Sequence, residues 1–198
     1  MRKLLLVGVC CLAFNMTLRA QQYSKGYLDS VKEFYRQWSE KERIYPVFKI
    51  VDNTTDSLGV KIALHEIRQC IKQGKLIFHS FKQDNSDSVV LSSKEVNYAL
   101  RKIKTSQYFS WPTDFFPSAE IIHNHVFNSP SFDTLNYDRT KKGYWFLSLP
   151  VFLKKNGKFC LLFQLYYCGS DCGIEDITLY KNENGYWRGY GAIMQSIF

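Results

Sequence analysis

Two carboxylates and two histidines form a group of side chains with the chemistry of a metal site. They are Glu120, His123, His125 and Asp133. A His-x-His spacing on a strand places both imidazoles on the same face, and zinc sites use such pairs. A metal held there could activate a water molecule for hydrolysis. Such a site also needs further ligands and supporting contacts, and paired surface histidines give the same pattern, so a metal-dependent hydrolase is the alternative prediction.

Four cysteines follow the first twenty residues of the chain: Cys70, Cys160, Cys168 and Cys172. In an oxidising compartment an even number of cysteines favours disulfides over free thiols. Cys168 and Cys172 could close a tight turn, which would leave Cys70 and Cys160 to join a helix to a strand; the two other pairings stay open. Redox exchange would need a stabilised thiolate, and Asp171 opposes one, so a structural role is favoured.

The signatures of several common enzyme classes are absent. The sequence has no Gly-x-Ser-x-Gly motif, phosphate-binding loop or dinucleotide fingerprint. His65 and Glu66 are followed by Gln69 at the position where a zinc protease motif has its second histidine. The sequence therefore favours a binding protein over an enzyme, and no cofactor is expected.

Aromatic residues are abundant, with 15 Phe, 13 Tyr and 4 Trp in 198 residues. Tyrosine and tryptophan supply large amphipathic contact areas and are enriched at interaction surfaces. Six of these side chains are the candidate binding residues: Tyr166, Tyr180, Tyr186, Trp187, Trp111 and Phe127. The other interpretation is that they pack in the core under the helices.

Three segments have the apolar periodicity of amphipathic helices: residues 24–43, residues 61–73 and a segment that begins at Ser92. Ser92 and Glu95 fit a capping box at the start of the third helix. That helix ends with three basic residues, which is too few for a nucleic-acid patch, so no nucleic-acid partner is expected. Short strands are predicted over residues 43–51 and 75–81.

The C-terminal part of the chain has the pattern of an antiparallel sheet. Strands are predicted over residues 144–153, 159–168, 174–180 and 185–194, with Asn-Gly hairpins at Asn156 and Asn184. The preceding helices need a sheet face on which to bury their apolar stripes. The prediction is therefore an α+β fold, with N-terminal amphipathic helices packed on a C-terminal antiparallel meander. Residues 105–142 are predicted to form a long loop that could also be a binding surface.

The N-terminal residues have the order of a cleavable secretory signal peptide. Arg2 and Lys3 precede an apolar run over residues 4–14, and Ala20 is a small residue at the expected cleavage point. The run is too short to span a membrane as a helix. Removal of residues 1–20 lowers the formal net charge from +8 to +5. The sequence predicts an exported protein, periplasmic or at the cell surface, with residues 21–198 as a single domain and no transmembrane segment.

Three motifs in the last part of the chain resemble a pattern in small uncharacterised exported proteins of Bacteroidota. They are Ser-Leu-Pro-Val-Phe from Ser148, Cys-Gly-Ser-Asp-Cys-Gly from Cys168, and Asn-Gly-Tyr-Trp from Asn184. The resemblance implies a location in the cell envelope and an α+β structure. It implies no catalytic residues.

These observations favour an exported, non-enzymatic binding or interaction module. We expect it to bind a protein or an envelope ligand through its sheet face or through residues 106–142. Neutralising an incoming toxin, in the manner of an immunity protein, is one concrete version. The metal-dependent hydrolase is the alternative, and disulfide exchange by Cys168 and Cys172 is a third hypothesis.

Overall fold

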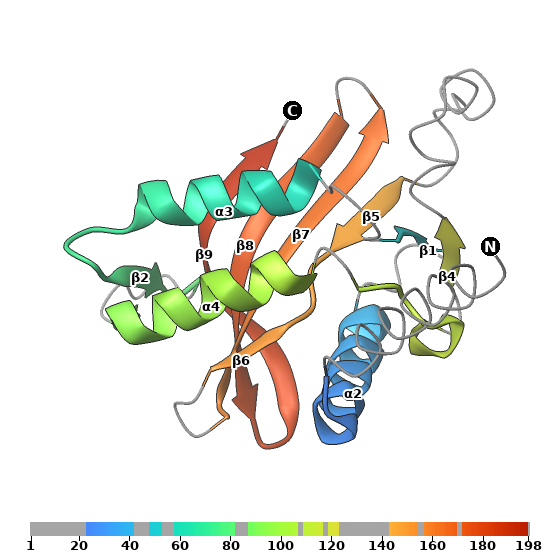
Figure 1. Cartoon of the computed structure of the whole chain (residues 1–198), viewed down its shortest axis with the longest axis horizontal. Coiled ribbons are helices and arrows are strands. Elements are labelled where there is room, and N and C mark those ends of the chain that lie inside the picture. Colours follow the sequence, from blue (N-terminus) through green and yellow to red (C-terminus); the bar gives the residue numbers. More distant parts are fainter. Residues whose placement is uncertain are drawn as a thin grey trace, which may run out of the picture. The chain divides into compact units, whose positions relative to one another are not determined.

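The computed structural model (Figure 1) describes parts of the chain that carry most of the predicted elements. These parts are residues 23–41, 48–52, 58–81, 87–106, 109–116, 119–122, 143–153, 157–169 and 172–197. Residues 1–20, where the signal peptide is predicted, lie outside the described residues, as do residues 123–142 of the predicted long loop. The chain divides into two compact units, Met1–Glu33 and Phe34–Phe198, at a point within the first described helix.

The described helices precede the long strands of the sheet. The helices are α2 (Lys25–Lys41), α3 (Leu58–Cys70) and α4 (Ser93–Ser106), with a short 3-10 helix η1 (Thr113–Phe115). The strands are β1 (Phe48–Val51), β2 (Leu76–His79), β3 (Ser88–Leu91), β4 (Ala119–Ile122), β5 (Tyr144–Leu147), β6 (Val151–Leu153), β7 (Phe159–Gly169), β8 (Cys172–Glu183) and β9 (Tyr186–Ile197). The predicted α+β class is confirmed. Among the described residues, no helix combines the length and the apolar character needed to cross a membrane.

In the first unit, α2 begins directly after Ser24, which caps it. The Ser24 Oγ accepts a hydrogen bond of 3.3 Å from the main-chain nitrogen of Tyr27, and the Ser24 carbonyl accepts one of 3.1 Å from Leu28. A serine at this position supplies a partner for a main-chain N–H of the first helical turn. The helix therefore begins where the sequence predicts it.

The main sheet has the strand order β4-β1-β5-β7-β8-β9, and β6 also pairs with β7. Strands β7, β8 and β9 are antiparallel, whereas β1 is parallel to both β4 and β5. The β8–β9 hairpin turns at Asn184 and Gly185, whose φ angles are 57° and 89°. Positive φ at both positions is the conformation that an Asn-Gly turn favours. The predicted antiparallel meander and its second hairpin are confirmed.

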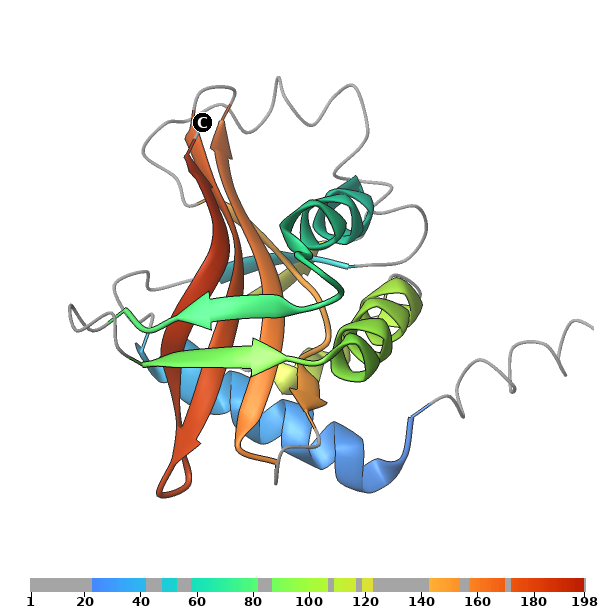
Figure 2. The same ribbon diagram turned by 90° about the vertical axis from the view of Figure 1, so that its left-hand side faces the viewer.

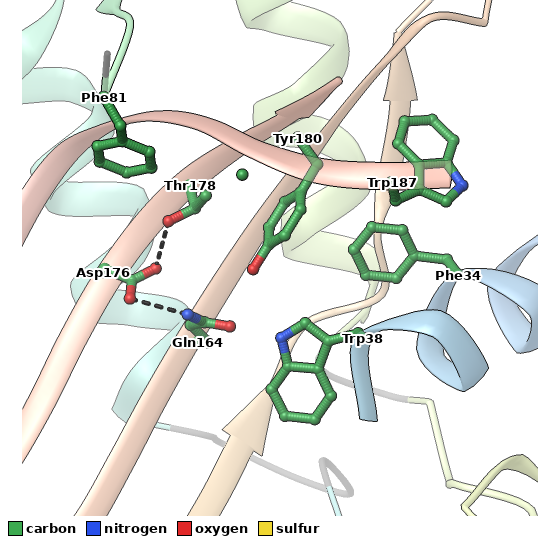
Figure 3. A pocket seen from close by; sticks show the side chains of 9 residues that line it. Phe34, Trp38, Phe81, Gln164, Asp176, Thr178, Tyr180 and Trp187 are labelled. Carbon is green, nitrogen blue, oxygen red and sulfur yellow. Dashed lines mark hydrogen bonds between the residues drawn. The ribbon is translucent and has the colours of Figure 1, made fainter. Parts of the chain in front are cut away.

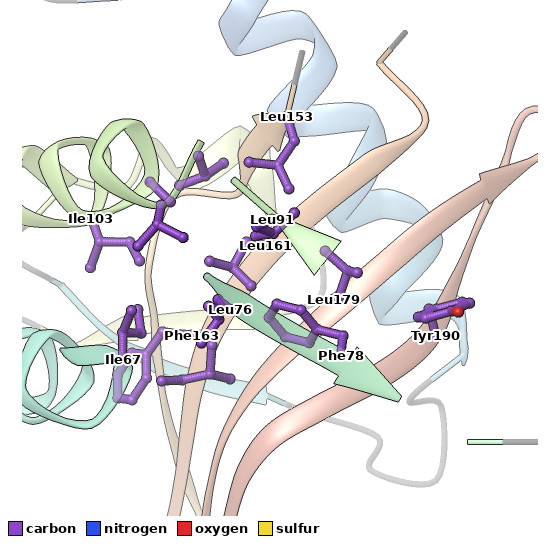
Figure 4. Packing of buried hydrophobic residues seen from close by; sticks show 14 residues of the cluster. Ile67, Leu76, Phe78, Leu91, Ile103, Leu153, Leu161, Phe163, Leu179 and Tyr190 are labelled. Carbon is purple, nitrogen blue, oxygen red and sulfur yellow. The ribbon is translucent and has the colours of Figure 1, made fainter. Parts of the chain in front are cut away.

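Helices α3 and α4 lie on one face of the β7–β9 sheet (Figures 1 and 2). The apolar core on this face is formed by both helices, by β2 and β3, and by β6 to β9 (Figure 4). Odd-numbered residues of the two central strands belong to it, namely Leu161 and Phe163 of β7 and Ile177 and Leu179 of β8. Because side chains alternate along a strand, the even-numbered residues of β7 and β8 face the opposite side of the sheet.

The capping box predicted for the third helix is present at the start of α4. The main-chain nitrogen of Ser92 donates to Glu95 Oε2 at 3.0 Å, and the main-chain nitrogen of Glu95 donates to Ser92 Oγ at 3.4 Å. The two residues thus satisfy each other's main-chain N–H groups. The apolar side chains of α4, including Val96 and Ile103, are buried in the core.

The hairpin of β2 and β3 crosses the helix-covered face of the sheet and reaches β9 (Figure 2). The main-chain nitrogen of Phe81 donates a 2.7 Å hydrogen bond to the carbonyl of Tyr190 in β9. Gly191 permits this close approach, because a Cβ atom at that position would overlap the main-chain oxygen of His79. Phe81 is thereby placed alongside β9.

The opposite face of the sheet is covered by the second half of α2, from Phe34 onward. The Phe34 ring makes an edge contact with Tyr180 of β8, with centroids 5.2 Å apart. Trp38, one helical turn later, makes an edge contact with Trp145 of β5 at 5.2 Å. Phe34 and Trp38, which lie within the predicted helix over residues 24–43, therefore pack on the sheet.

The strand predicted over residues 144–153 is divided into β5 and β6 by a bulge. Residues 148–150 stand opposite only two residues of β7. Ser148 bonds across the irregular position, because its main-chain nitrogen donates to the Phe163 carbonyl at 3.0 Å and its Oγ accepts from the Phe163 nitrogen at 3.1 Å. Pro150 has no N–H to donate to the strand pairing, which accounts for the break at this point.

The predicted pairing of Cys70 with Cys160 is wrong, since both residues are free thiols in the structure. Cys70 packs against the core under α3 and α4. Cys160 is an even-numbered residue of β7 and so belongs to the opposite face of the sheet. The sheet itself therefore separates the two sulfurs. The side chains of Cys168 and Cys172, which form the other predicted pair, lie outside the described residues.

Candidate functional site

A pocket of about 220 Å³ lies on the α2 side of the sheet (Figure 3). It is lined by Phe34, Trp38, Phe81, Gln164, Asp176, Thr178, Tyr180, Trp187 and Gly189. Most of these side chains are aromatic, and three polar ones, Gln164, Asp176 and Thr178, lie together. The pocket thus combines aromatic walls with one localised polar group, which is the usual composition of a small-molecule site.

The alternation of side chains along β8 explains why the polar residues lie on the pocket side of the sheet. Asp176, Thr178 and Tyr180 are two residues apart and therefore share one face of the sheet. Gln164 of β7 is the direct cross-strand partner of Asp176. Gln164 Nε2 donates to Asp176 Oδ2 at 2.8 Å, and Thr178 Oγ1 donates to Asp176 Oδ1 at 2.7 Å. Two hydrogen bonds from two strands fix the orientation of this carboxyl group.

Asp176 is buried within the pocket wall, with 8% of its surface exposed. Burial raises the pKa of Asp176 above its ordinary value, while the hydrogen bonds from Gln164 and Thr178 act in the opposite direction. No Lys, Arg or His is among the described residues that line the pocket. These described residues therefore stabilise the carboxyl group with neutral donors and supply no countercharge.

Gln164 has an unused acceptor in the pocket. Its Oε1 atom is buried and has no hydrogen-bond partner among the residues that the structure describes. Figure 3 shows this oxygen turned away from Asp176, toward Trp38, and the Tyr180 hydroxyl directed to the same space. Buried polar atoms are almost always paired, so an unpaired one in a pocket wall calls for a specific explanation.

The aromatic wall is held in place by α2. The Phe34 ring contacts the Trp187 ring with centroids 5.7 Å apart. Gln37, on the same helix, donates to the Gly185 carbonyl at 3.0 Å and accepts from the Trp187 nitrogen at 2.9 Å. The Gln37 side chain thus joins helix α2 to the main chain of the β8–β9 hairpin, and it fixes the backbone at Trp187.

Phe81 forms the outer part of the wall. Its side chain is 59% exposed, and its ring lies 3.5 Å from where a Cβ atom of Gly189 would be. The main-chain bond from Phe81 to β9 fixes the backbone at this point. An exposed phenylalanine over a pocket gains apolar contact when a ligand covers it.

The structure brings two of the predicted binding residues together and separates the others. Tyr180 and Trp187 line the pocket. Tyr166 lies nearer β5, where its ring is 4.9 Å from that of Trp145. Tyr186 is 64% exposed at the hairpin and does not line the pocket. Phe127 lies outside the described residues.

Trp111 is a core residue in the structure, with 4% of its surface exposed. Its main-chain nitrogen donates to Asp52 Oδ1 at 3.0 Å, and its ring makes edge contacts with Tyr35 and Phe116. The alternative interpretation of these aromatic residues, that they pack in the core, applies to Trp111.

Of the predicted metal ligands, Glu120 is an exposed residue of β4. His123, His125 and Asp133 lie outside the described residues. Within the parts of the chain that the structure describes, no group of three His, Cys, Asp or Glu side chains is placed to hold a metal ion.

Sequence reasoning missed most of the pocket. Phe34 and Trp38 fall within the predicted helix over residues 24–43, and Phe81 falls within the predicted strand over residues 75–81. Neither pattern indicates a ligand site, and the sequence does not indicate that Gln164, Asp176 and Thr178 lie together. A signal was present, because Gln164 and Asp176 are polar residues within two strands that are otherwise rich in apolar and aromatic side chains. Comparison of the chain with models of known protein families, with curated proteins and with solved structures finds no match.

Proposed function

We propose that this chain is an exported binding module of the cell envelope, and that its ligand site is the aromatic pocket beside Asp176. The observation that carries the proposal is the buried Gln164 Oε1, which faces the pocket and has no hydrogen-bond partner in the described part of the chain. A ligand that donates a hydrogen bond to this oxygen would satisfy it, which adds to the affinity because the oxygen has already lost its water.

The surrounding side chains support the same role. Asp176 is held by two hydrogen bonds before any ligand arrives, and Trp187 is fixed by Gln37. A site whose polar and aromatic groups are already oriented loses little conformational entropy on binding. Export is proposed from the order of charged, apolar and small residues in positions 1–20.

The binding proposal is tested by ligand-observed NMR with a set of small aromatic and amphipathic molecules and the purified protein. The key variant is Phe81→Ala, because Phe81 is an exposed wall residue whose loss leaves the core intact. The matched control is Tyr186→Ala, an equally exposed aromatic residue outside the pocket. Molecules that bind the wild type and Y186A but lose affinity for F81A support the proposal. Binding that is unaffected by F81A, or no binding by any molecule, refutes it.

Export has its own measurement. The mass of the protein recovered from the periplasm or medium of an expressing bacterium should equal that of the chain without residues 1–20. Recovery of the full-length chain from the cytoplasm alone would contradict export without bearing on the pocket.

A further inference from the structure

We infer that the pocket binds a small organic cation, an alkyl- or arylalkylammonium ion whose nitrogen lies against Asp176 and Gln164. This inference rests on the proposed function, since it names the class of ligand for the same site. It is drawn from the charge, the hydrogen-bonding groups and the aromatic walls of the pocket, each of which narrows the range of ligands.

The charge of the pocket favours a cation. Among the described residues that line the pocket, Asp176 alone has an ionisable side chain of a type that is charged at neutral pH, and it is buried. An ionised carboxylate taken out of water is costly unless an opposite charge accompanies it. The described lining residues supply only neutral donors to it. A ligand with a positive charge would offset this cost, whereas a carboxylate or phosphate ligand would add a second negative charge.

The hydrogen-bonding groups favour a donor. Gln164 Oε1 is an acceptor that no described residue pairs with. Each Asp176 oxygen has lone-pair capacity beyond its single bond from Gln164 or Thr178. An ammonium group has three N–H donors and no acceptor. It can therefore donate to both residues at once, and hydrogen bonds from an ammonium to a carboxylate are about twice as strong as neutral ones.

The walls favour an organic cation over a hydrated inorganic one. Trp38 and Tyr180 lie next to the polar group, and Phe34 and Trp187 line the pocket beyond Tyr180 (Figure 3). Aromatic faces attract cations, most strongly where water is excluded, and their apolar area suits a hydrocarbon body. Pockets for drug-sized ligands have volumes of about 300–1,000 Å³. The present pocket, at about 220 Å³, fits a shorter amine.

The test compares three ligands of similar shape by isothermal titration calorimetry with the purified protein. Phenethylammonium chloride is the cation, 2-phenylethanol its neutral analogue and sodium phenylacetate its anionic analogue. We expect the cation to bind about tenfold more tightly than the alcohol, and the anion to bind more weakly than both. Equal affinity for the cation and the alcohol, or tighter binding of the anion, would overturn the inference.

Two variants assign the preference to the pocket carboxylate. Asp176→Asn keeps the size of the side chain and removes its charge, so the preference for the cation over the alcohol should disappear. Glu175→Gln is the matched control, because Glu175 is an equally buried acid on the same strand whose side chain faces the opposite side of the sheet. It should keep the preference. Thermal melting verifies that both variants fold. If one does not, the three-ligand comparison in the wild type still tests the inference.

The outcomes separate this inference from the proposed function. If none of the three ligands binds but other molecules bind in a Phe81-dependent manner, the cation inference fails and the pocket remains a binding site. If no molecule shows Phe81-dependent binding, the proposed function fails as well. A preference for the cation that persists in D176N would locate the charge recognition elsewhere and overturn the inference.

Discussion

The hydroxyl group of Tyr35 donates a 2.6 Å hydrogen bond to the main-chain oxygen of Ser148. Both residues are completely buried. The bond joins α2 to the bulge between β5 and β6, at the point where regular strand pairing is interrupted. Because Phe34 and Trp38 lie on the same helix and line the pocket, this contact also helps to fix the pocket wall.

Replacing Tyr35 by Phe should lower the free energy of unfolding by about 1–3 kcal/mol, because the Ser148 oxygen would lose its donor in a place that water does not reach. Urea denaturation of Y35F and wild type measures the difference. Tyr186→Phe serves as the control, since the Tyr186 side chain is largely exposed. A Y35F curve that overlays that of the wild type would show that the bond contributes nothing.

The capping box of α4 gives a second prediction. Ser92→Ala removes the side-chain oxygen that accepts from the Glu95 nitrogen, so the free energy of unfolding should fall by about 1 kcal/mol. Lys94→Ala, an exposed change in the same helical turn, should have little effect. The comparison is again made by urea denaturation, and equal losses in the two variants would argue against the cap.

Two glycines of β9 should differ sharply in their tolerance of a methyl group. In Gly191→Ala the new Cβ would overlap the main-chain oxygen of His79. Neither the β9 main chain at Gly191 nor the β2 main chain at His79 can move without breaking strand contacts. A loss of about 3 kcal/mol or more is expected. In Gly189→Ala the Cβ would meet the Phe81 ring at an ordinary 3.5 Å, and a small change is expected. Thermal melting of both variants would settle this, and similar melting temperatures would contradict the prediction.

Asp176 and Glu175 should make stability fall as pH rises. Burial is the main cause that raises the pKa of each above its ordinary value, 3.8 for Asp and 4.5 for Glu. In the window between the unfolded and folded pKa values the folded state binds more protons, so the free energy of unfolding decreases with increasing pH. Their contribution is complete below the unfolded values and is lost as pH rises through the folded ones.

The measurement is urea denaturation between acid and neutral pH for wild type, E175Q and D176N. Each variant should lose part of the decline with pH. E175Q should also be more stable than the wild type at neutral pH, because it removes the cost of a buried charge, whereas D176N also loses one of the two acceptor oxygens for Gln164 and Thr178. Profiles that run parallel to that of the wild type would show that these carboxyl groups do not change their pKa on folding.

The sequence predicts well the elements that local patterns determine. Helix α2 follows from its apolar spacing and Ser24, the start of α4 from the Ser92 and Glu95 pair, and the β8–β9 turn from Asn184 and Gly185. In each case the deciding contacts lie within a few residues of one another. Such signals can therefore be recognised in a short stretch of sequence.

Other features depend on contacts between distant parts of the chain. Strands β1 and β4 pair in parallel across some seventy residues, and a four-residue strand carries little pattern of its own. The free state of Cys70 and Cys160 follows from the face of the sheet that each occupies, which sequence spacing does not reveal. The pocket was missed for the same reason, because Asp176 becomes a site residue only when α2 covers its face of the sheet.

The bulge at Ser148 also changes which face of the sheet the odd-numbered residues occupy. Before the bulge, odd-numbered Trp145 faces α2, where it meets Trp38. After it, odd-numbered Val151 and Leu153 face the core under α3 and α4, because the extra residue shifts the alternation by one. In diverging relatives of this chain, we therefore expect insertions and deletions to accumulate at the hairpin tips. The number of residues between Trp145 and Val151 should stay fixed.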